Sequence, residues 1–104
     1  MSMQGAIPVQ EHDGTVVVCP VGALDLAVAD ELWSTLARAV DFARRAVRID
    51  LDAVTFVDST ALGAFVRAWR HAEGRGIALC VVRPAPNVRR VLAITGLEGL
   101  LCPD

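Results

Sequence analysis

Asp58-Ser59-Thr60-Ala61-Leu62-Gly63 lies where a predicted buried strand passes into an amphipathic helix, a transition that is typical of α/β folds. The residues before it, 47–57, are mostly apolar and predict a strand followed by an apolar connection. The residues after it carry an apolar stripe with helical spacing, made of Leu62, Phe65, Val66 and Trp69. The start of the hexapeptide therefore lies at a helix N-terminus, where backbone N–H groups lack partners and the helix dipole favours negative charge.

Two hydroxyls beside a carboxylate at a helix start have two possible uses. Ser, Thr and Asp are the preferred capping residues, and most such clusters only cap a helix. A hydroxyl at this place can also accept a phosphate, whose negative charge a helix N-terminus tolerates. The hexapeptide alone leaves both uses open, with the general preference on the side of capping.

The composition describes one globular domain, residues 1–104, with enough apolar side chains for a core at 54% hydrophobic content. The formal net charge of −2 argues against nucleic acid as a direct partner. No apolar run reaches the length of a membrane span, and the first residues lack the basic flank and apolar centre of a signal peptide. We therefore expect a cytoplasmic protein.

The three cysteines, Cys19, Cys80 and Cys102, are odd in number and far apart in the sequence. We expect them to be reduced, with Cys19 and Cys80 acting as small buried side chains in apolar strands. A redox pair between neighbouring strands is the alternative. Metal binding is not expected, because no two cysteines have ligand spacing and only His12 and His71 could assist.

The rest of the pattern predicts two strands followed by helices and strands in alternation. The predicted strands are 6–11, 15–21, 46–51 and 77–82, with a short last strand at 100–102. The predicted helices are 28–45, 59–73 and a short one near 88–95, capped by Asn87 or a neighbour. Residues 12–14 predict a hairpin turn, residues 22–26 a loop, and the 77–82 strand reads as buried on both faces. This order predicts an α/β fold with a mainly parallel β-sheet, crossover helices and an antiparallel N-terminal edge strand.

Four local patterns carry a family resemblance. They are Gly22-Ala23-Leu24-Asp25 after the second strand, Val57 to Gly63 at the helix start, Pro86 to Leu92 at the entry to the third helix, and Thr95-Gly96-Leu97 at its exit. Together they span about residues 7–102, and in this order and spacing they resemble the STAS domain of anti-sigma factor antagonists and sulfate-transporter tails. The second pattern is similar to the family's Asp-Ser-Ser/Thr-Gly-Leu-Gly signature.

The resemblance implies an anti-sigma factor antagonist. Such a protein binds an anti-sigma factor, a kinase-like protein that otherwise holds a sigma factor, and so releases the sigma factor. The anti-sigma factor phosphorylates the serine after the motif aspartate, which corresponds to Ser59, and a serine phosphatase reverses this. ATP and Mg²⁺ belong to the kinase partner, so no cofactor is expected here. The expected partner-binding residues are Asp25, Asp58, Ser59, Thr60, Ala61, Leu62 and Gly63, with Asp25 beside Ser59 at one sheet edge.

The sequence departs from the family pattern in three places. Ala61 stands where the family usually has Gly, which adds a methyl group that we expect beside Ser59. Ala23 stands where the family usually has Glu, which removes a polar group near Asp25. The usual C-terminal helix has no counterpart before Asp104, so an apolar face of the sheet is expected to be less covered.

Two other functions remain as alternatives. A STAS scaffold subunit of a lipid-transporting ABC complex would need no phosphorylation. An enzyme would need Ser59 as a nucleophile, yet no Gly-x-Ser-x-Gly elbow surrounds it, and the base would have to be His12 or His71. Asp50 and Asp52 are a conceivable acid–base pair, although solvated carboxylates at a strand end are more common. We expect no catalytic activity.

Overall fold

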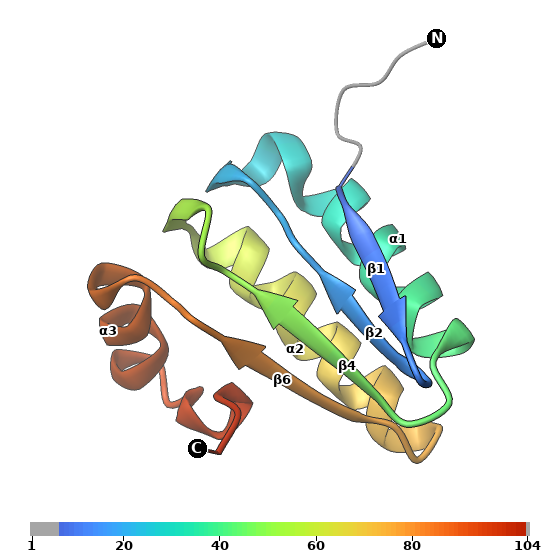
Figure 1. The fold of residues 1–104 in the computed structure, drawn as a ribbon. Helices are drawn as coiled ribbons and strands as arrows, with labels where there is room; N and C mark the ends of the chain where they lie inside the picture. Colours follow the sequence, from blue (N-terminus) through green and yellow to red (C-terminus); the bar gives the residue numbers. More distant parts are fainter. Residues whose placement is uncertain (1–6, 104) are drawn as a thin grey trace, which may run out of the picture.

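The computed structural model describes residues 7–103, and its main feature is a four-stranded sheet in the order β1-β2-β4-β6. The strands are β1 (Val9–His12), β2 (Thr15–Val18), β4 (Ala46–Asp50) and β6 (Ala78–Val82). β1 runs antiparallel to β2, whereas the β2–β4 and β4–β6 pairs are parallel (Figure 1). The predicted α/β fold with an antiparallel N-terminal edge strand is confirmed.

The turn between β1 and β2 has the chemistry that its sequence predicts. Asp13 and Gly14 both have positive φ, at 55° and 88°, and a two-residue hairpin turn with both central residues in this region matches the twist of the strands. Gly14 is also confined, since a Cβ there would lie 3.3 Å from Cγ of Arg45.

A second, two-stranded parallel ribbon lies beside the main sheet, made of β3 (Gly22–Leu24) and β5 (Val54–Val57). The prediction of a loop at residues 22–26 is therefore wrong. Gly22, at φ 82°, turns the chain, and its N–H donates to the carbonyl of Ala53 at 2.8 Å. β3 forms only because it pairs with residues 54–57, so the local sequence of residues 22–24 does not predict a strand.

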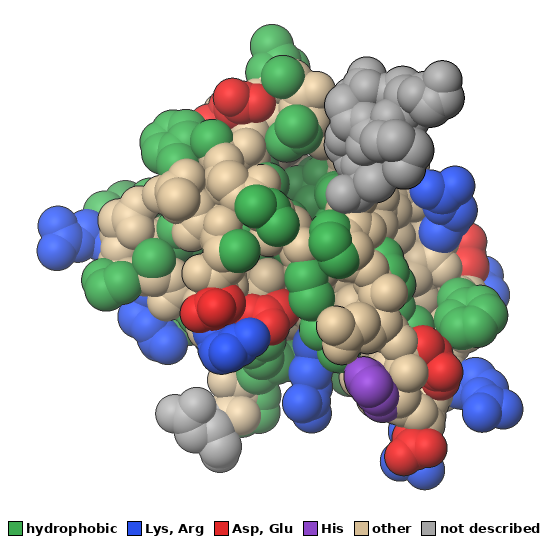
Figure 2. All heavy atoms as spheres, turned by 45° about the horizontal axis from the view of Figure 1, so that its top comes forward, with side chains coloured by type: hydrophobic (Ala, Val, Ile, Leu, Met, Phe, Trp, Pro, Cys, Tyr) green, Lys and Arg blue, Asp and Glu red, His purple; other side chains and the backbone are tan. Residues whose placement is uncertain are grey.

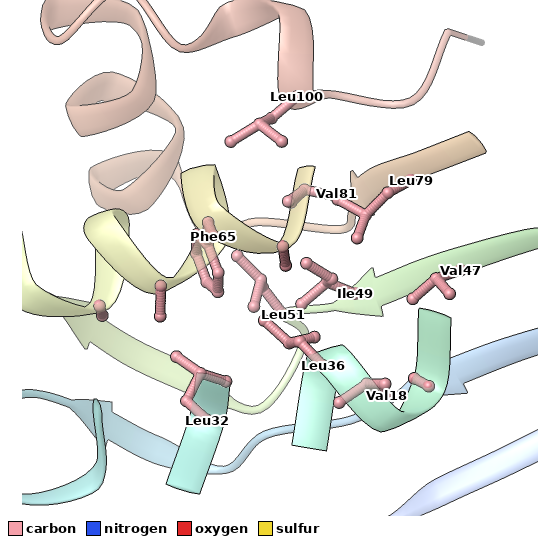
Figure 3. Packing of buried hydrophobic residues seen from close by; sticks show 14 of the residues in the cluster. Val18, Leu32, Leu36, Val47, Ile49, Leu51, Phe65, Leu79, Val81 and Leu100 are labelled. Atoms are coloured by element: carbon pink, nitrogen blue, oxygen red, sulfur yellow. The ribbon is translucent and has the colours of Figure 1, made fainter. Parts of the chain in front are cut away.

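Helices α1 (Leu26–Phe42) and α2 (Ser59–Gly74) pack against the same face of the main sheet (Figure 1). The core between them is formed by fully buried side chains, including Leu32, Leu36, Val47, Ile49 and Phe65 (Figure 3). The opposite face of the sheet is more open, so burial alternates along β2, β4 and β6, whereas all of β1 is exposed. In β6, Leu79 and Val81 are buried while Ala78 is exposed, which corrects the prediction of a strand buried on both faces.

The C-terminal part departs from prediction in two respects. Helix α3 (Pro86–Ile94) has Ala85 as its N-cap without a side-chain hydrogen bond, so capping by Asn87 is wrong. Nδ2 of Asn87 instead donates to the carbonyl of Thr55 at 3.1 Å. A 3₁₀ turn, η1 (Glu98–Leu100), follows, and Leu101 forms one isolated parallel bridge with Val81 where we predicted a strand.

The cysteines are not all reduced, which corrects the expectation from the sequence. Cys80 and Cys102 are joined as a disulfide, with their Cα atoms 4.9 Å apart, and Cys19 is free and half-buried. The pair forms because the bridge at Leu101 brings the end of the chain beside β6. Cys80 and Cys102 become neighbours only in the folded structure, so their spacing in the sequence does not predict the disulfide.

Candidate functional site

Two helix N-termini lie side by side at one end of the β3–β5 ribbon. The ribbon pairs Leu24 with Val57, and the next residue on each strand, Asp25 or Asp58, is the N-cap of a helix. The N–H of Asp58 donates to the carbonyl of Leu24 at 3.1 Å, which fixes the two starts relative to each other. Asp25 and Ser59 are thereby brought to the same end of the ribbon, as expected for successive parallel strands.

Asp58 carries out the capping at the start of α2. Its Oδ1 accepts hydrogen bonds from the N–H groups of Thr60 and Ala61 at 2.9 and 3.1 Å, and from Oγ1 of Thr60 at 2.5 Å. The Thr60 hydroxyl is the main reason why the pKa of the Asp58 carboxyl lies below its usual value, and the amides of Ala61, Thr60 and Leu26 act in the same direction. Leu26 is the first residue of α1, so amides from the starts of both helices stabilise the ionised form of the Asp58 carboxyl.

Ser59 is left free by this arrangement. It is the first residue of α2, it is exposed, and its hydroxyl makes no hydrogen bond with any residue in the range 7–103. Thr60 differs, because it is half-buried and its hydroxyl is already committed to Asp58. The helix is therefore capped by the Asp58 carboxylate and not by either hydroxyl. Of the two hydroxyls, that of Ser59 is the one that is accessible from solvent.

Few amide donors remain for an anion at this helix start. The N–H of Asp58 donates to Leu24, and the N–H groups of Thr60 and Ala61 donate to Asp58. Our expectation that several free N–H groups would face a phosphate on Ser59 is therefore corrected. A phosphate there would gain from the helix dipole but would stay in solvent, beside a carboxylate of the same sign.

The rest of the motif divides between the core and the surface. Ala61 is 0% exposed and Leu62 is 8% exposed, so both side chains pack inward and offer little surface to a partner. The methyl group of Ala61 likewise points away from the surface around Ser59. Gly63, one turn after Ser59, is exposed, and no atom lies within 4 Å of where its Cβ would stand.

Exposed apolar side chains occur on the elements that adjoin the start of α2, and they were not predicted from the sequence. Leu26 is 73% exposed and Phe56 is 50% exposed, and Phe56 lies in register with exposed Ala23 across the ribbon. Figure 2 brings this end of the molecule forward and shows hydrophobic side chains distributed over it. The sequence did contain one indication of an exposed apolar side chain here, because Leu26 directly follows the capping residue Asp25 at the start of a helix. We call Asp25, Leu26, Phe56, Ser59 and Gly63 the Ser59 surface.

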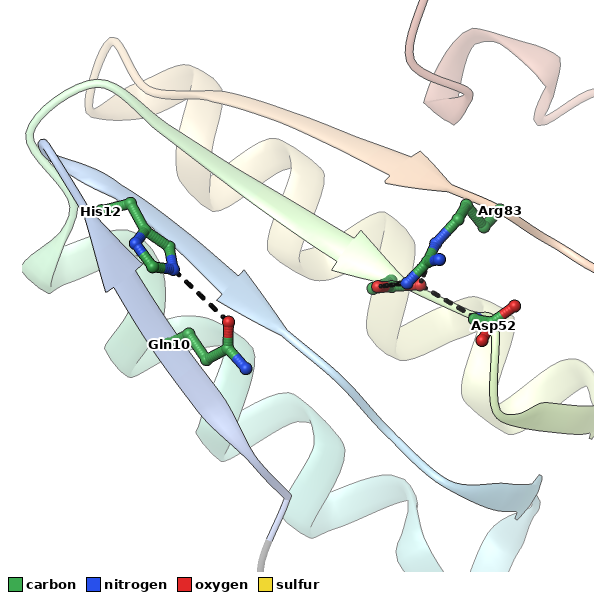
Figure 4. A network of polar contacts seen from close by, with 5 residues as sticks. Gln10, His12, Asp52 and Arg83 are labelled. Carbon is green, nitrogen blue, oxygen red and sulfur yellow. Dashed lines mark hydrogen bonds and ion pairs between the residues drawn. The ribbon is translucent and has the colours of Figure 1, made fainter.

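The residues considered for catalysis are placed elsewhere. Asp50 pairs with Arg83, whose Nη2 and Nε lie 2.5 and 3.2 Å from its two oxygens (Figure 4), and this hydrogen bonding lowers the pKa of the Asp50 carboxyl. Such a carboxylate is a poor proton donor. Asp52 is exposed in the turn after β4, where its N–H donates to Asp50 at 3.0 Å.

Neither histidine of the chain can act on Ser59. Nε2 of His12 lies 3.4 Å from Oε1 of Gln10 on β1 (Figure 4). His71 contacts Asp41 at 2.8 Å and lies twelve residues after Ser59 on the same helix, or about 18 Å along its axis. Ser59 therefore has no histidine within reach that could act as its base.

Two further features of residues 7–103 bear on partners. Nowhere in this range do three or more His, Cys, Asp or Glu side chains cluster as a metal ion would require. None of the helices that the structure describes combines the length and the apolar character of a bilayer span.

Comparisons with known proteins agree with this geometry. A family model described as the STAS domain matches residues 6–102. The anti-sigma-B factor antagonist of Staphylococcus aureus is 29% identical over 80 residues, which cover 77% of this chain and 74% of that protein. A solved anti-sigma factor antagonist from Mycobacterium paratuberculosis is 30% identical, with a TM-score of 0.78 over 97% of this chain and 87% of that one. The antagonist SpoIIAA in its unphosphorylated form shares the fold, with a TM-score of 0.77 at 21% identity over 92% and 85% of the two chains.

Proposed function

The chain belongs to the STAS domain family, and on that premise we propose that it is an anti-sigma factor antagonist whose binding is switched off by phosphorylation of Ser59. In this role it binds a kinase-like anti-sigma factor, which carries the ATP, and a serine phosphatase restores the binding form. Relatives named as anti-sigma factor antagonists support the partner class. A structure of SpoIIAA described as the phosphorylated form, with a TM-score of 0.70, supports phosphorylation as the control.

The proposal rests mainly on one observation, which is that Asp58 caps α2 while the hydroxyl of Ser59 is left free. Asp58 satisfies the amides of the helix start, so the fold does not need the Ser59 hydroxyl. That hydroxyl is exposed at the start of α2, and two exposed apolar side chains lie on adjoining elements, Leu26 at the start of α1 and Phe56 on β5. A kinase-like partner needs an apolar surface to bind and an accessible hydroxyl to phosphorylate. The exposed Ser59 hydroxyl and the exposed apolar side chains provide both.

The electrostatics explain how a phosphate would act as a switch. The phosphate adds a charge of about −1.5 to −2 next to the Asp58 carboxylate, and it finds few free amides to neutralise it. The domain need not change shape, because the charge sits outside the helix. A partner surface complementary to a neutral hydroxyl would instead have to bury an unpaired charge, which costs about 2–5 kcal/mol.

A phosphotransfer assay tests the proposal. The protein is incubated with candidate kinase-like anti-sigma factors and ATP, and the phosphate is located by peptide mass spectrometry. We expect one phosphate, on Ser59, and none on the Ser59→Ala variant. Thr60→Val is the matched control, and it should be phosphorylated at the wild-type rate because the Thr60 hydroxyl only serves Asp58.

Phosphate that is incorporated into Ser59→Ala at the wild-type rate would overturn the assignment of the acceptor. A protein that associates instead with the ATPase of a lipid transporter, without any phosphorylation, would favour the scaffold alternative.

A further inference from the structure

The pair Cys80 and Cys102 is a second feature with chemical consequences, independent of the Ser59 surface. Cys80 is half-buried on β6, on the face of the sheet turned away from α1 and α2, and Cys102 is half-buried directly after Leu101. Their Cα separation of 4.9 Å lies within the range that a disulfide needs. We propose that Cys80 and Cys102 form a reversible thiol–disulfide site, which exchanges with small soluble disulfides of the oxidised-glutathione type.

The surrounding contacts hold the two cysteines together without help from the sulfur bond. Leu100 is 0% exposed and anchors the segment in the core. Leu101 pairs with Val81, and the N–H of Cys102 donates to the carbonyl of Val81 at 2.9 Å. Because these contacts do not involve sulfur, the reduced form keeps both thiols in position, and closure of the ring is favoured over two separate mixed disulfides.

Partial exposure makes the pair accessible to exchange. Disulfides that solvent reaches are the ones that are readily reduced and re-formed, whereas fully buried ones resist. Neither Cys80 nor Cys102 is fully buried.

The exchange proceeds in two balanced steps. The thiolate of one cysteine attacks a sulfur of the small disulfide, whose S–S bond breaks and releases one small thiol with the electron pair. The thiolate of the other cysteine then displaces the second small thiol from the mixed disulfide. Two protein thiols are thereby oxidised, the small disulfide is reduced to two thiols, and the two protons pass from the protein to them.

Cys19 provides an internal control. It is half-buried after β2 and has no disulfide partner among residues 7–103. Burial, and secondly the nearby Asp50 carboxylate, raise the pKa of its thiol, which lowers the fraction present as reactive thiolate. Cys19 should therefore stay reduced under conditions that oxidise the pair.

The closed ring includes α3 and η1, because the two cysteines are separated by 22 positions in the sequence. Joining positions this far apart restricts the unfolded chain and so stabilises the folded one. The oxidised protein is expected to melt on the order of 10 °C above the reduced protein.

The test is a redox titration of the full chain. Wild type, Cys19→Ser and Cys102→Ser are equilibrated across ratios of reduced to oxidised glutathione, alkylated with N-ethylmaleimide, and analysed by intact mass and peptide mapping. In wild type and Cys19→Ser, two thiols should be lost together, with Cys80 linked to Cys102. Cys102→Ser should form no internal disulfide.

Three thiols that remain alkylatable at every ratio, or a linkage that includes Cys19, would overturn the proposal. Thermal melts give an independent readout, since oxidation should raise the Tm of Cys19→Ser but not of Cys102→Ser. A Cys80–Cys102 bond that stays closed even at the most reducing ratio would also overturn it, because the site would then not be reversible.

Discussion

Gly63→Ala is predicted to strengthen the fold and weaken partner binding at the same time. Gly63 lies inside α2, it is exposed, and a Cβ there would meet no atom within 4 Å. Its backbone φ is not in the left-handed region, where alanine would be strained. The fold itself therefore gives no reason for glycine at this position, and we infer that the reason is close approach of a partner, one turn from Ser59.

The magnitudes follow from this geometry. Alanine in place of glycine in a helix interior stabilises by about 0.5–1 kcal/mol, which corresponds to a rise in Tm of roughly 2–6 °C for a domain of this size. A methyl group inserted into a packed interface costs about 1–3 kcal/mol. Affinity should then fall by roughly 5- to 150-fold.

Gly74→Ala is the matched control. Gly74 ends the same helix, is also exposed, and likewise has no atom within 4 Å of a Cβ, but it lies at the end remote from Ser59. Thermal melts and calorimetric titration with the anti-sigma factor should show a comparable or smaller gain in Tm and no loss of affinity. Wild-type affinity of Gly63→Ala would refute the inference that the partner approaches this helix face.

Three further changes probe the surface, the cap and the core. Leu26→Ser should leave Tm nearly unchanged, because the side chain is 73% exposed, and should reduce affinity at least tenfold in the same titration. Asp58→Ala should lower Tm by roughly 5 °C at pH 7. The pKa of the Asp58 carboxyl is depressed in the fold, so its stabilisation is present above the ordinary value of about 3.9 and is lost as pH falls below it; the difference in Tm should thus shrink by pH 3, and an undiminished difference would contradict this. Phe65→Ala should lower the free energy of unfolding in urea by about 3–5 kcal/mol, since Phe65 is fully buried, and a loss under 1 kcal/mol would contradict the packing.

Local patterns predicted the elements whose formation depends on local chemistry. The apolar spacing of Leu62 and Phe65 placed α2, and Asp13-Gly14 placed the hairpin turn with the required positive φ at both residues. The β3–β5 ribbon could not be predicted in this way, because Gly22–Leu24 is three residues long and its partner strand begins thirty residues later. The pairing of Cys80 with Cys102 was hidden for the same reason, since a single bridge at Leu101 creates it.

The candidate site was predicted in position but not in orientation. The motif placed Ser59 at a helix start, and the structure confirms that position for the residue. The motif alone did not distinguish the two faces of the helix, whose periodicity turns Ala61 and Leu62 into the core and leaves Ser59 and Gly63 outside. The apolar stripe that predicted the helix already put Leu62 on the inner face.

Phosphorylation of Ser59 as the switch is tested by calorimetry, which compares the affinity of the anti-sigma factor for Ser59→Glu with its affinity for Ser59→Ala and wild type. A carboxylate at this helix start gains about 0.3–1 kcal/mol from the dipole, so the melting temperature of Ser59→Glu should stay close to that of wild type. Its affinity should fall by roughly 30-fold or more, because the interface would bury an unpaired charge. Ser59→Ala should bind as wild type and keep binding in the presence of ATP. Normal binding by a stably folded Ser59→Glu protein would contradict the account.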